Sequence, residues 1–375
     1  MSDKRSTLSK LKKSFRIPIR LRRNRHEEAI DALEGPLPPF LQAPPPRADV
    51  QVLQKEWQFK ERRTDLIEHL DSLYEKAYEF DKPLVDPTAY NKLKIRCETL
   101  DLGDDGECEN GIDVPNFFVP FPLETLMEHR IVTPDEETKR DYEAHEDIFD
   151  RTKNGFESRA PYFRLIWHFE CFRRSGIPDG PGRLIDITVW RKHSAYSEFM
   201  QEYFEPGVCF QPSHRPAAWW TAKTTSLPHL MCILDHRSKG SDEVFRGEIL
   251  TILATTITRF ELECFQDEVV IPRQSLMNDC SWCRVLMFSV MSDSKARIIQ
   301  AYFNGDKLVI RKSRLYDFST PETLSSSTTL FMQWMASKTG GNTSGFPLED
   351  FEPFEEDDDT ELFGKKEIEK ISDAP

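Results

Sequence analysis

The sequence lacks any uninterrupted apolar run of about 18 residues, so we expect no transmembrane helix. Its beginning also lacks the apolar segment of a secretory signal. The eight cysteines are scattered, and some lie within apolar runs, such as Cys232 in HLMCIL. This usage is typical of reduced, buried thiols. We therefore expect a cytoplasmic or nuclear protein without a membrane partner.

The sequence also lacks the short motifs of several enzyme classes. It contains no G-x-S-x-G elbow, no G-x-x-x-x-G-K-[ST] loop, no G-x-G-x-x-G turn and no kinase signature set. Its one C-x-x-C pair, Cys280 and Cys283, has neither the second pair nor the histidine pair that a zinc site needs. Structural thiols are favoured there over a metal site or a redox dithiol, and no cofactor is expected.

Charge is concentrated at the two ends of the chain. Residues 1–25 hold ten Lys/Arg and one Asp, whereas residues 346–375 hold twelve Asp/Glu and three Lys. The net charge of −14 argues against nucleic acid as a partner of the whole protein, and only residues 1–25 could bind it. A solvated arm, a nuclear-import signal and a mitochondrial presequence remain alternatives for this basic stretch.

Composition divides the chain into a core and two ends. Residues 1–46 are basic and Pro-rich, residues 341–375 are acidic, and both are predicted to be disordered. Residues 47–340 are predicted to form a single α+β core domain, which is long enough to bury a sizeable interior.

Two aromatic features are candidates for contact with a protein partner. The acidic stretch interleaves Phe351 and Phe354 with carboxylates, a pattern of segments that dock onto partners. Trp219 and Trp220 are adjacent in RPAAWWTAK, and they predict either a cap on the core or an aromatic contact site.

Periodicity predicts several elements before residue 240. Apolar residues at helical spacing predict a long helix over 50–80, and a partly buried helix is expected over 157–174. RLIDITVW at 183–190 indicates a strand, and HSAYSEFMQEYFE at 193–205 indicates a helix. HLMCILDH at 229–236 is short and apolar, which favours a strand.

The best-defined block, 242–338, has the order α-β-β-β-α. A helix over 242–265 is followed by a strand, RVLMFSVM, that should be covered on both faces. Asn304-Gly305 then predicts a type I′ hairpin turn. One face of this hairpin is apolar, and it comprises Ile299, Ala301, Phe303, Leu308 and Ile310. A helix that begins with the capping residues of SSSTTLFMQWMAS, from residue 325, closes the block.

The same order resembles the core of restriction-endonuclease-like nucleases. These enzymes hold a divalent metal with a helix Glu, a strand Asp and a Glu-x-Lys strand, which matches Glu248 and Asp293 here. At the third position the sequence has Gln300, with no lysine two residues on. The metal would lose a hard oxygen ligand, so a degenerate relative with a nucleic-acid-related role is the alternative reading.

The block from GEILTILATTITRF to LFMQWM also resembles a family of uncharacterised filamentous-fungal proteins, mainly over 242–338. Its hairpin is similar to the segment that precedes the kinase domain in fungal-specific kinase-like proteins. Neither resemblance implies catalytic residues for this chain. Without a complete catalytic set, the sequence favours a non-enzymatic interaction or scaffold protein with an unknown protein partner.

Overall fold

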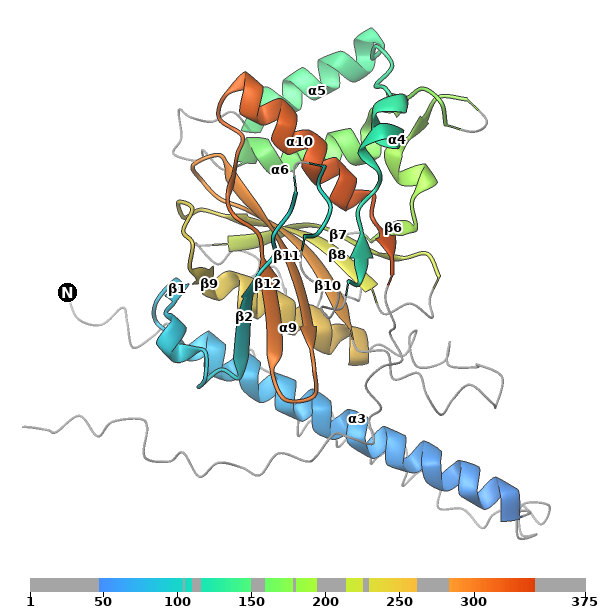
Figure 1. Cartoon of the computed structure of the whole chain (residues 1–375), viewed down its shortest axis with the longest axis vertical. Helices are drawn as coiled ribbons and strands as arrows, with labels where there is room; N and C mark the ends of the chain where they lie inside the picture. Colours follow the sequence, from blue (N-terminus) through green and yellow to red (C-terminus); the bar gives the residue numbers. More distant parts are fainter. Residues whose placement is uncertain are drawn as a thin grey trace, which may run out of the picture. The chain divides into compact units, whose positions relative to one another are not determined.

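The computed structural model describes residues 47–103, 105–109, 116–149, 159–177, 180–193, 214–224, 229–261 and 283–340. The chain divides into two units, Met1–Gln58 and Phe59–Pro375, and the fold below is that of the second unit. It is α+β, as predicted, with helices packed against a large mixed sheet (Figure 1). The ends expected to be disordered, 1–46 and 341–375, lie outside the described residues.

The sheet has eight strands. Seven form the order β2-β12-β11-β10-β8-β7-β6, and β13 pairs with β11. Two neighbouring pairs, β2 with β12 and β8 with β10, are parallel, and the other pairs are antiparallel. The strands are β2 (Ile95–Thr99), β6 (Trp190–His193), β7 (His214–Ala222), β8 (His229–His236), β10 (Arg284–Val290), β11 (Lys295–Phe303), β12 (Leu308–Lys312) and β13 (Tyr316–Asp317).

Helices and short ribbons complete the unit. The helices are α3 (Arg47–Glu79), α4 (Leu123–Glu128), α5 (Glu136–Phe149), α6 (Arg159–Ile166), α9 (Arg246–Glu261) and α10 (Pro321–Met335). Single turns are the 3₁₀ helices η2 (Pro87–Ala89) and η5 (Leu184–Ile187) and the π-helix η4 (Trp167–Cys171). The two-stranded ribbons are β1 (Leu84–Val85) with β9 (Val244–Phe245), β3 (Phe118–Val119) with β14 (Lys338–Thr339), and β4 (Arg173–Arg174) with β5 (Gly182–Arg183).

Both faces of the sheet are buried. One hydrophobic core lies between the sheet and helices α3 and α9, and the other lies between the sheet and helices α6, η4 and α10. Successive strand residues alternate between the two cores: Met287 packs in the first and Phe288 in the second. Because every position of β8 and β10 is buried, these strands read as continuous apolar runs.

Elements with strong local patterns appear as predicted. The helix expected over 50–80 is α3, and HLMCILDH forms strand β8. The block has the order α9, β10, β11, β12, β13, α10, so it adds the two-residue strand β13 to the predicted order, and β10 is fully buried. The predicted apolar face of the hairpin is confirmed, since all five of its residues belong to the core beneath α3 and α9. Gln300 and Arg311 are partners on the opposite face.

The hairpin turn differs from the prediction. Phe303 pairs with Leu308, so the loop has four residues rather than two. Gly305 has φ of 99°, but Asn304 is not among the described residues with positive φ. The Asn304 side-chain oxygen instead accepts the backbone N–H of Lys307 at 2.8 Å and of Asp306 at 3.1 Å. Asn304 therefore closes an Asx turn, a role that competes with the type I′ conformation.

Three other element predictions were wrong in part. The segment 183–190 is mostly the 3₁₀ turn η5, and strand β6 begins only at Trp190. The helix expected from 242 begins at Arg246, because Val244 and Phe245 pair with β1 as strand β9. The helix expected over 157–174 ends at Cys171 with a π turn.

The last helix begins earlier than predicted. Its N-cap is Thr320, whose hydroxyl accepts the Thr323 N–H at 3.3 Å, and Pro321 occupies the first turn. The Thr323 hydroxyl in turn accepts the Thr320 N–H at 3.2 Å. Ser325, the cap expected from the sequence, lies inside the helix. The predicted helix over 193–205 lies beyond the described residues apart from His193, which ends β6.

Replacing the true cap should destabilise the protein more than replacing the apparent one. We expect Thr320→Ala to lower the free energy of unfolding by about 1 kcal/mol, because the N–H of Thr323 loses its acceptor. Ser325→Ala should change it by less than about 0.5 kcal/mol, as for a surface substitution. Urea denaturation of both variants measures this, and equal losses would contradict the assignment of the cap.

Candidate functional site

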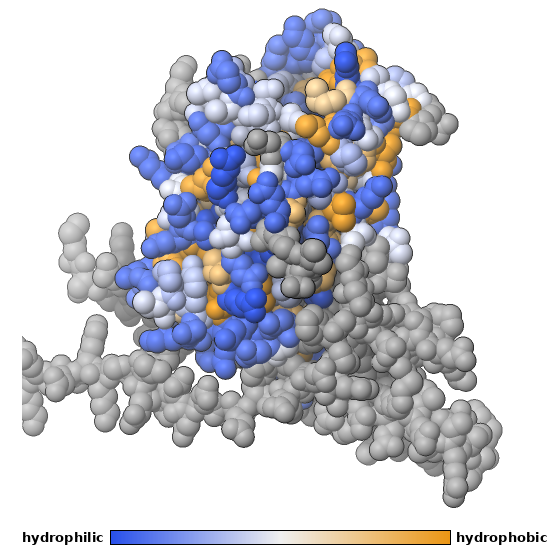
Figure 2. All heavy atoms as spheres, in the orientation of Figure 1, coloured by the Kyte–Doolittle hydropathy of each residue, from blue (hydrophilic) through white to orange (hydrophobic). Residues whose placement is uncertain are grey.

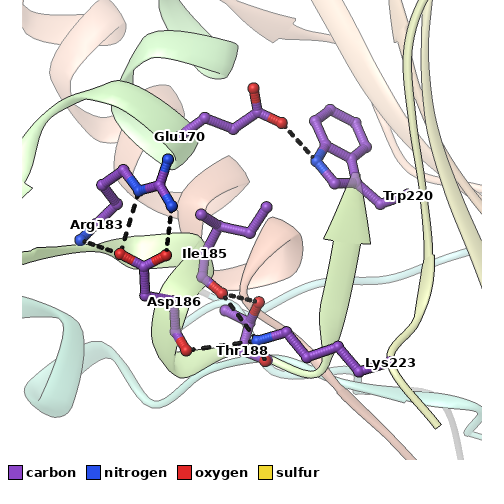
Figure 3. Close-up of polar contacts among 7 residues, drawn as sticks. All are labelled: Glu170, Arg183, Ile185, Asp186, Thr188, Trp220 and Lys223. Atoms are coloured by element: carbon purple, nitrogen blue, oxygen red, sulfur yellow. Dashed lines mark hydrogen bonds and ion pairs between the residues drawn. The ribbon is translucent and has the colours of Figure 1, made fainter. Parts of the chain in front are cut away.

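The paired tryptophans belong to the interior. Trp219 and Trp220 are consecutive residues of β7, so their side chains enter opposite cores, and both are at most 2% exposed. The Trp220 indole donates a hydrogen bond to Glu170 at 2.7 Å (Figure 3). The expectation of an aromatic contact site at this pair is therefore corrected, because helices cover the sheet on both sides. Phe351 and Phe354 lie outside the described residues and remain predicted contacts.

Glu248, the helix carboxylate of the nuclease reading, is held in a buried ion pair. It is 0% exposed, and Arg297 on β11 binds both of its oxygens, with Nε 2.9 Å from Oε1. Oε2 also accepts the backbone N–H of Phe245 at 2.8 Å. The same guanidinium donates to the carbonyl oxygens of Ser241 and Glu243. Glu248 thus fixes the loop before α9 to the sheet.

The other two nuclease candidates do not join Glu248. Asp293 accepts the Gly240 N–H at 2.9 Å and lies 3.5 Å from the Lys295 ammonium. Gln300 is three positions from Arg297 on β11, so its side chain lies on the opposite face of the sheet. Among the residues that the structure describes, no three His, Cys, Asp or Glu side chains are grouped so that they could hold a metal ion.

Breaking the buried pair should be costly. We expect Arg297→Met to lower the free energy of unfolding by about 3–5 kcal/mol, because Glu248 is left charged and buried without a partner. The double variant Glu248→Leu/Arg297→Met should lose less, because no charge is then left behind. Chemical denaturation measures both. The matched control, Lys295→Met, removes a partly exposed contact and should cost less than about 1 kcal/mol. A double variant no more stable than Arg297→Met would contradict this account.

A second polar centre surrounds Glu170 at the β6 edge of the sheet. Glu170 lies in the π-helix η4 and is 8% exposed. Its carboxylate accepts the Trp220 indole N–H and pairs with the ammonium of Lys192 on β6. Single-turn π-helices are frequent at functional sites, which makes the Glu170 centre a candidate for a catalytic or binding site. Both carboxylate oxygens, however, are already engaged by side chains of the sheet.

The charged side chains beside Glu170 in Figure 3 bind backbone carbonyl groups and one another, so they do not form a substrate site. The Lys223 ammonium donates to the carbonyl oxygens at the end of η5, the closest being that of Thr188 at 2.7 Å. Arg183 and Asp186 form a two-point ion pair across the same turn. Burial and the nearby Glu170 raise the pKa of Cys171, so its thiol stays protonated. The centre therefore joins η4 and η5 to the sheet edge.

Two buried cysteines elsewhere, Cys232 and Cys283, are equally poor nucleophiles. Burial raises the pKa of Cys283 to about 11, and Cys280 lies outside the described residues. Burial raises the pKa of Cys232 as well. A thiolate is the reactive form, so these buried thiols favour a structural role.

Two buried histidines lie near the start of α9. Burial and the nearby Arg246 lower the pKa of His214 to about 4, against a smaller opposite effect of Glu248. Burial, His214 and Arg297 lower the pKa of His236. The two rings are 6.1 Å apart, and His236 packs on Phe245 at 4.7 Å. Both rings are neutral in the folded protein at neutral pH.

Stability should therefore fall in mild acid. A histidine whose folded pKa is depressed binds its proton more readily when unfolded, so its contribution is complete above pH 6.5 and is lost as the pH falls toward 4. For His214 we expect a loss of about 2 kcal/mol between pH 7 and pH 5. His214→Asn should reduce the pH dependence of the free energy of unfolding by about this amount. An unchanged pH dependence in urea titrations would contradict the neutral state.

A cavity of about 250 Å³ lies beyond the ends of the parallel strands β2 and β12. It is lined by Thr99, Leu100, Asp101, Leu102, Glu109, Asp242, Lys312, Ser313, Arg314 and Tyr316. The Ser313 hydroxyl accepts the Ile298 N–H and donates to the Arg314 carbonyl, each at 2.9 Å. This serine is committed to backbone, and none of the lining residues is a histidine that could activate it.

A different kind of site appears on the surface. Side-chain exposure is described for the ranges above except residues 47–62, 145–149 and 159–160. Where it is described, the four exposed large apolar side chains all lie within residues 119–132. Val119 is 45% exposed, Met127 57%, Ile131 37% and Val132 38%. We call these four residues the 119–132 surface. Figure 2 shows apolar residues exposed in the region of α4, on the upper right of this view.

The local structure explains why these side chains stay outside. Helix α4 has only six residues: Leu126 is buried, whereas the next residue, about 100° further round the helix, is the exposed Met127. Ile131 bridges to Arg174, and the Val132 N–H donates to the Arg173 carbonyl at 2.9 Å. The sequence reasoning missed this surface. The short segment 123–128 offers too few apolar positions for periodicity to tell which of Leu126 and Met127 is buried.

Comparison of the chain with protein-family models, with curated proteins and with solved structures finds no match. No helix in the described ranges has the length and apolar character needed to cross a bilayer.

Proposed function

We propose that this chain is a non-enzymatic interaction protein, which binds an apolar and acidic segment of a partner protein on the 119–132 surface. One observation carries the proposal: where side-chain exposure is described, the exposed large apolar side chains fall within one sequence stretch of 14 positions. Scattered exposed apolar residues are normal on a soluble protein, whereas gathered ones mark contact surfaces.

The charges beside this surface define the partner. Arg130 precedes Ile131, Arg173 is hydrogen-bonded to Val132 through its backbone, and Lys338 is the strand partner of Val119. Arg130, Arg173 and Lys338 are all exposed. No salt bridge within 4 Å is formed by these three among the described residues, although hydrogen bonds and, more weakly, the nearby Arg173 lower the pKa of the Asp135 carboxyl. Three such cations around apolar side chains favour a segment that carries both carboxylates and apolar anchors.

The polar centres support the same proposal. Glu248 and Glu170 are both engaged in buried contacts, Asp293 accepts the Gly240 N–H, and Gln300 lies on the opposite face of β11 from Arg297. No contact among the described residues favours the nuclease-like alternative over an interaction role.

Charged substitutions on the surface should abolish partner binding without unfolding the protein. We expect Met127→Asp/Ile131→Asp to reduce co-purification of a specific partner from the native cell at least tenfold, because two carboxylates would replace the apolar anchors and repel an acidic segment. The measurement is quantitative mass spectrometry of proteins bound to the tagged full-length chain.

The matched control is Ser325→Asp, which adds a carboxylate at an exposed position of α10 that is not one of the four residues of the 119–132 surface. It should retain the partner, and circular dichroism should show native structure for all variants. Retention of the same partner by Met127→Asp/Ile131→Asp would contradict the proposal.

A further inference from the structure

The chain leaves the described structure beside the 119–132 surface. Strand β14 pairs with β3, which places Lys338 opposite Val119 and Thr339 opposite Phe118. One residue later, the Gly340 N–H donates to the Phe117 carbonyl at 2.9 Å. The buried Arg284 guanidinium stacks on the ring of Phe117, with its Cζ atom 4.0 Å from the ring centroid. Residue 341 therefore starts from an anchored point next to β3.

Residues 346–363 have the chemistry proposed for the partner. They carry apolar anchors between carboxylates, namely Phe346, Leu348, Phe351, Phe354, Leu362 and Phe363. An extended chain spans at most about 3.5 Å per residue, so Phe351 can lie up to about 38 Å from Gly340 and Phe354 up to about 49 Å. These lengths allow a fold-back onto α4 and the segment after it.

The charges on the two sides are complementary. Arg130, Arg173 and Lys338 flank Val119, Ile131 and Val132, whereas residues 346–363 contain nine carboxylates and no basic residue. Glu124 and Glu128 lie on α4 beside Met127, so an aromatic side chain rather than a carboxylate should contact that end of the surface.

We infer that residues 346–363 of this chain occupy its own 119–132 surface, and that a partner must displace them to bind. This inference rests on the proposed function, because it assigns the same surface to an internal competitor. Tethering favours the fold-back: a flexible connection gives an effective concentration of about 1 mM. A contact with an intrinsic dissociation constant of about 100 μM would then be about 90% formed in the full chain.

Photo-crosslinking in the full-length chain tests the inference. Met127→p-benzoylphenylalanine keeps an apolar side chain at the centre of the surface, and the same substitution at Ser325 serves as the positional control. After irradiation, mass spectrometry should find crosslinks from position 127 to residues 346–363, and at least fivefold fewer from position 325. Phe351→Ser/Phe354→Ser should reduce the crosslinks from position 127 at least fivefold. Ile371→Ser, an apolar residue beyond the proposed segment, should leave them unchanged.

An isotope mixture identifies the chain that supplies the segment. Irradiation of mixed ¹⁴N and ¹⁵N chains should give crosslinks only within one isotope if the contact is intramolecular. Mixed-isotope crosslinks at the statistical ratio would assign the surface to a second copy and overturn the inference. A lack of crosslinks from position 127 to 346–363 would overturn it as well. In that case partner loss in Met127→Asp/Ile131→Asp would still support the proposed function, so the two failures are distinguishable.

Discussion

The coverage of the central sheet on both faces is the constraint on which the rest of the structure depends. A strand in such a sheet must place apolar side chains in two directions, and β8 and β10 are buried at every position for this reason. The parallel pairing of β8 with β10 also requires a crossover connection, which contains helix α9. The helix that makes the connection thereby supplies one of the two covering layers.

This coverage gives the buried polar side chains their roles. A carboxylate inside such a fold must be paired and hydrogen-bonded, because an isolated buried charge is very unfavourable. Glu248 meets this requirement through Arg297, and Glu170 meets it through Trp220 and Lys192. Each contact joins an element to the sheet, α9 in one case and η4 in the other. Glu248 and Glu170, the carboxylates that most resemble catalytic groups, thus connect α9 and η4 to the sheet.

The 119–132 surface departs from this pattern of burial. On helix α4, Leu126 enters the core while the next residue, Met127, stays in solvent. In the proposed function, apolar contact with these residues supplies affinity, and the nearby cations determine which segment fits. A competing segment of the same chain would lower the apparent affinity for any partner and make binding depend on its displacement.

The sequence by itself determined the elements whose patterns are local. Period-2 alternation assigned the two faces of the hairpin correctly, and an uninterrupted apolar run identified β10. It could not assign the turn at Asn304, where the side chain competes with the backbone for hydrogen bonds. Tertiary structure alone decided that Trp219 and Trp220 are buried and that Met127 is exposed. It also decided that Arg297 forms an ion pair with Glu248. These outcomes depend on which distant segment covers each face of the sheet, and no local periodicity contains that information.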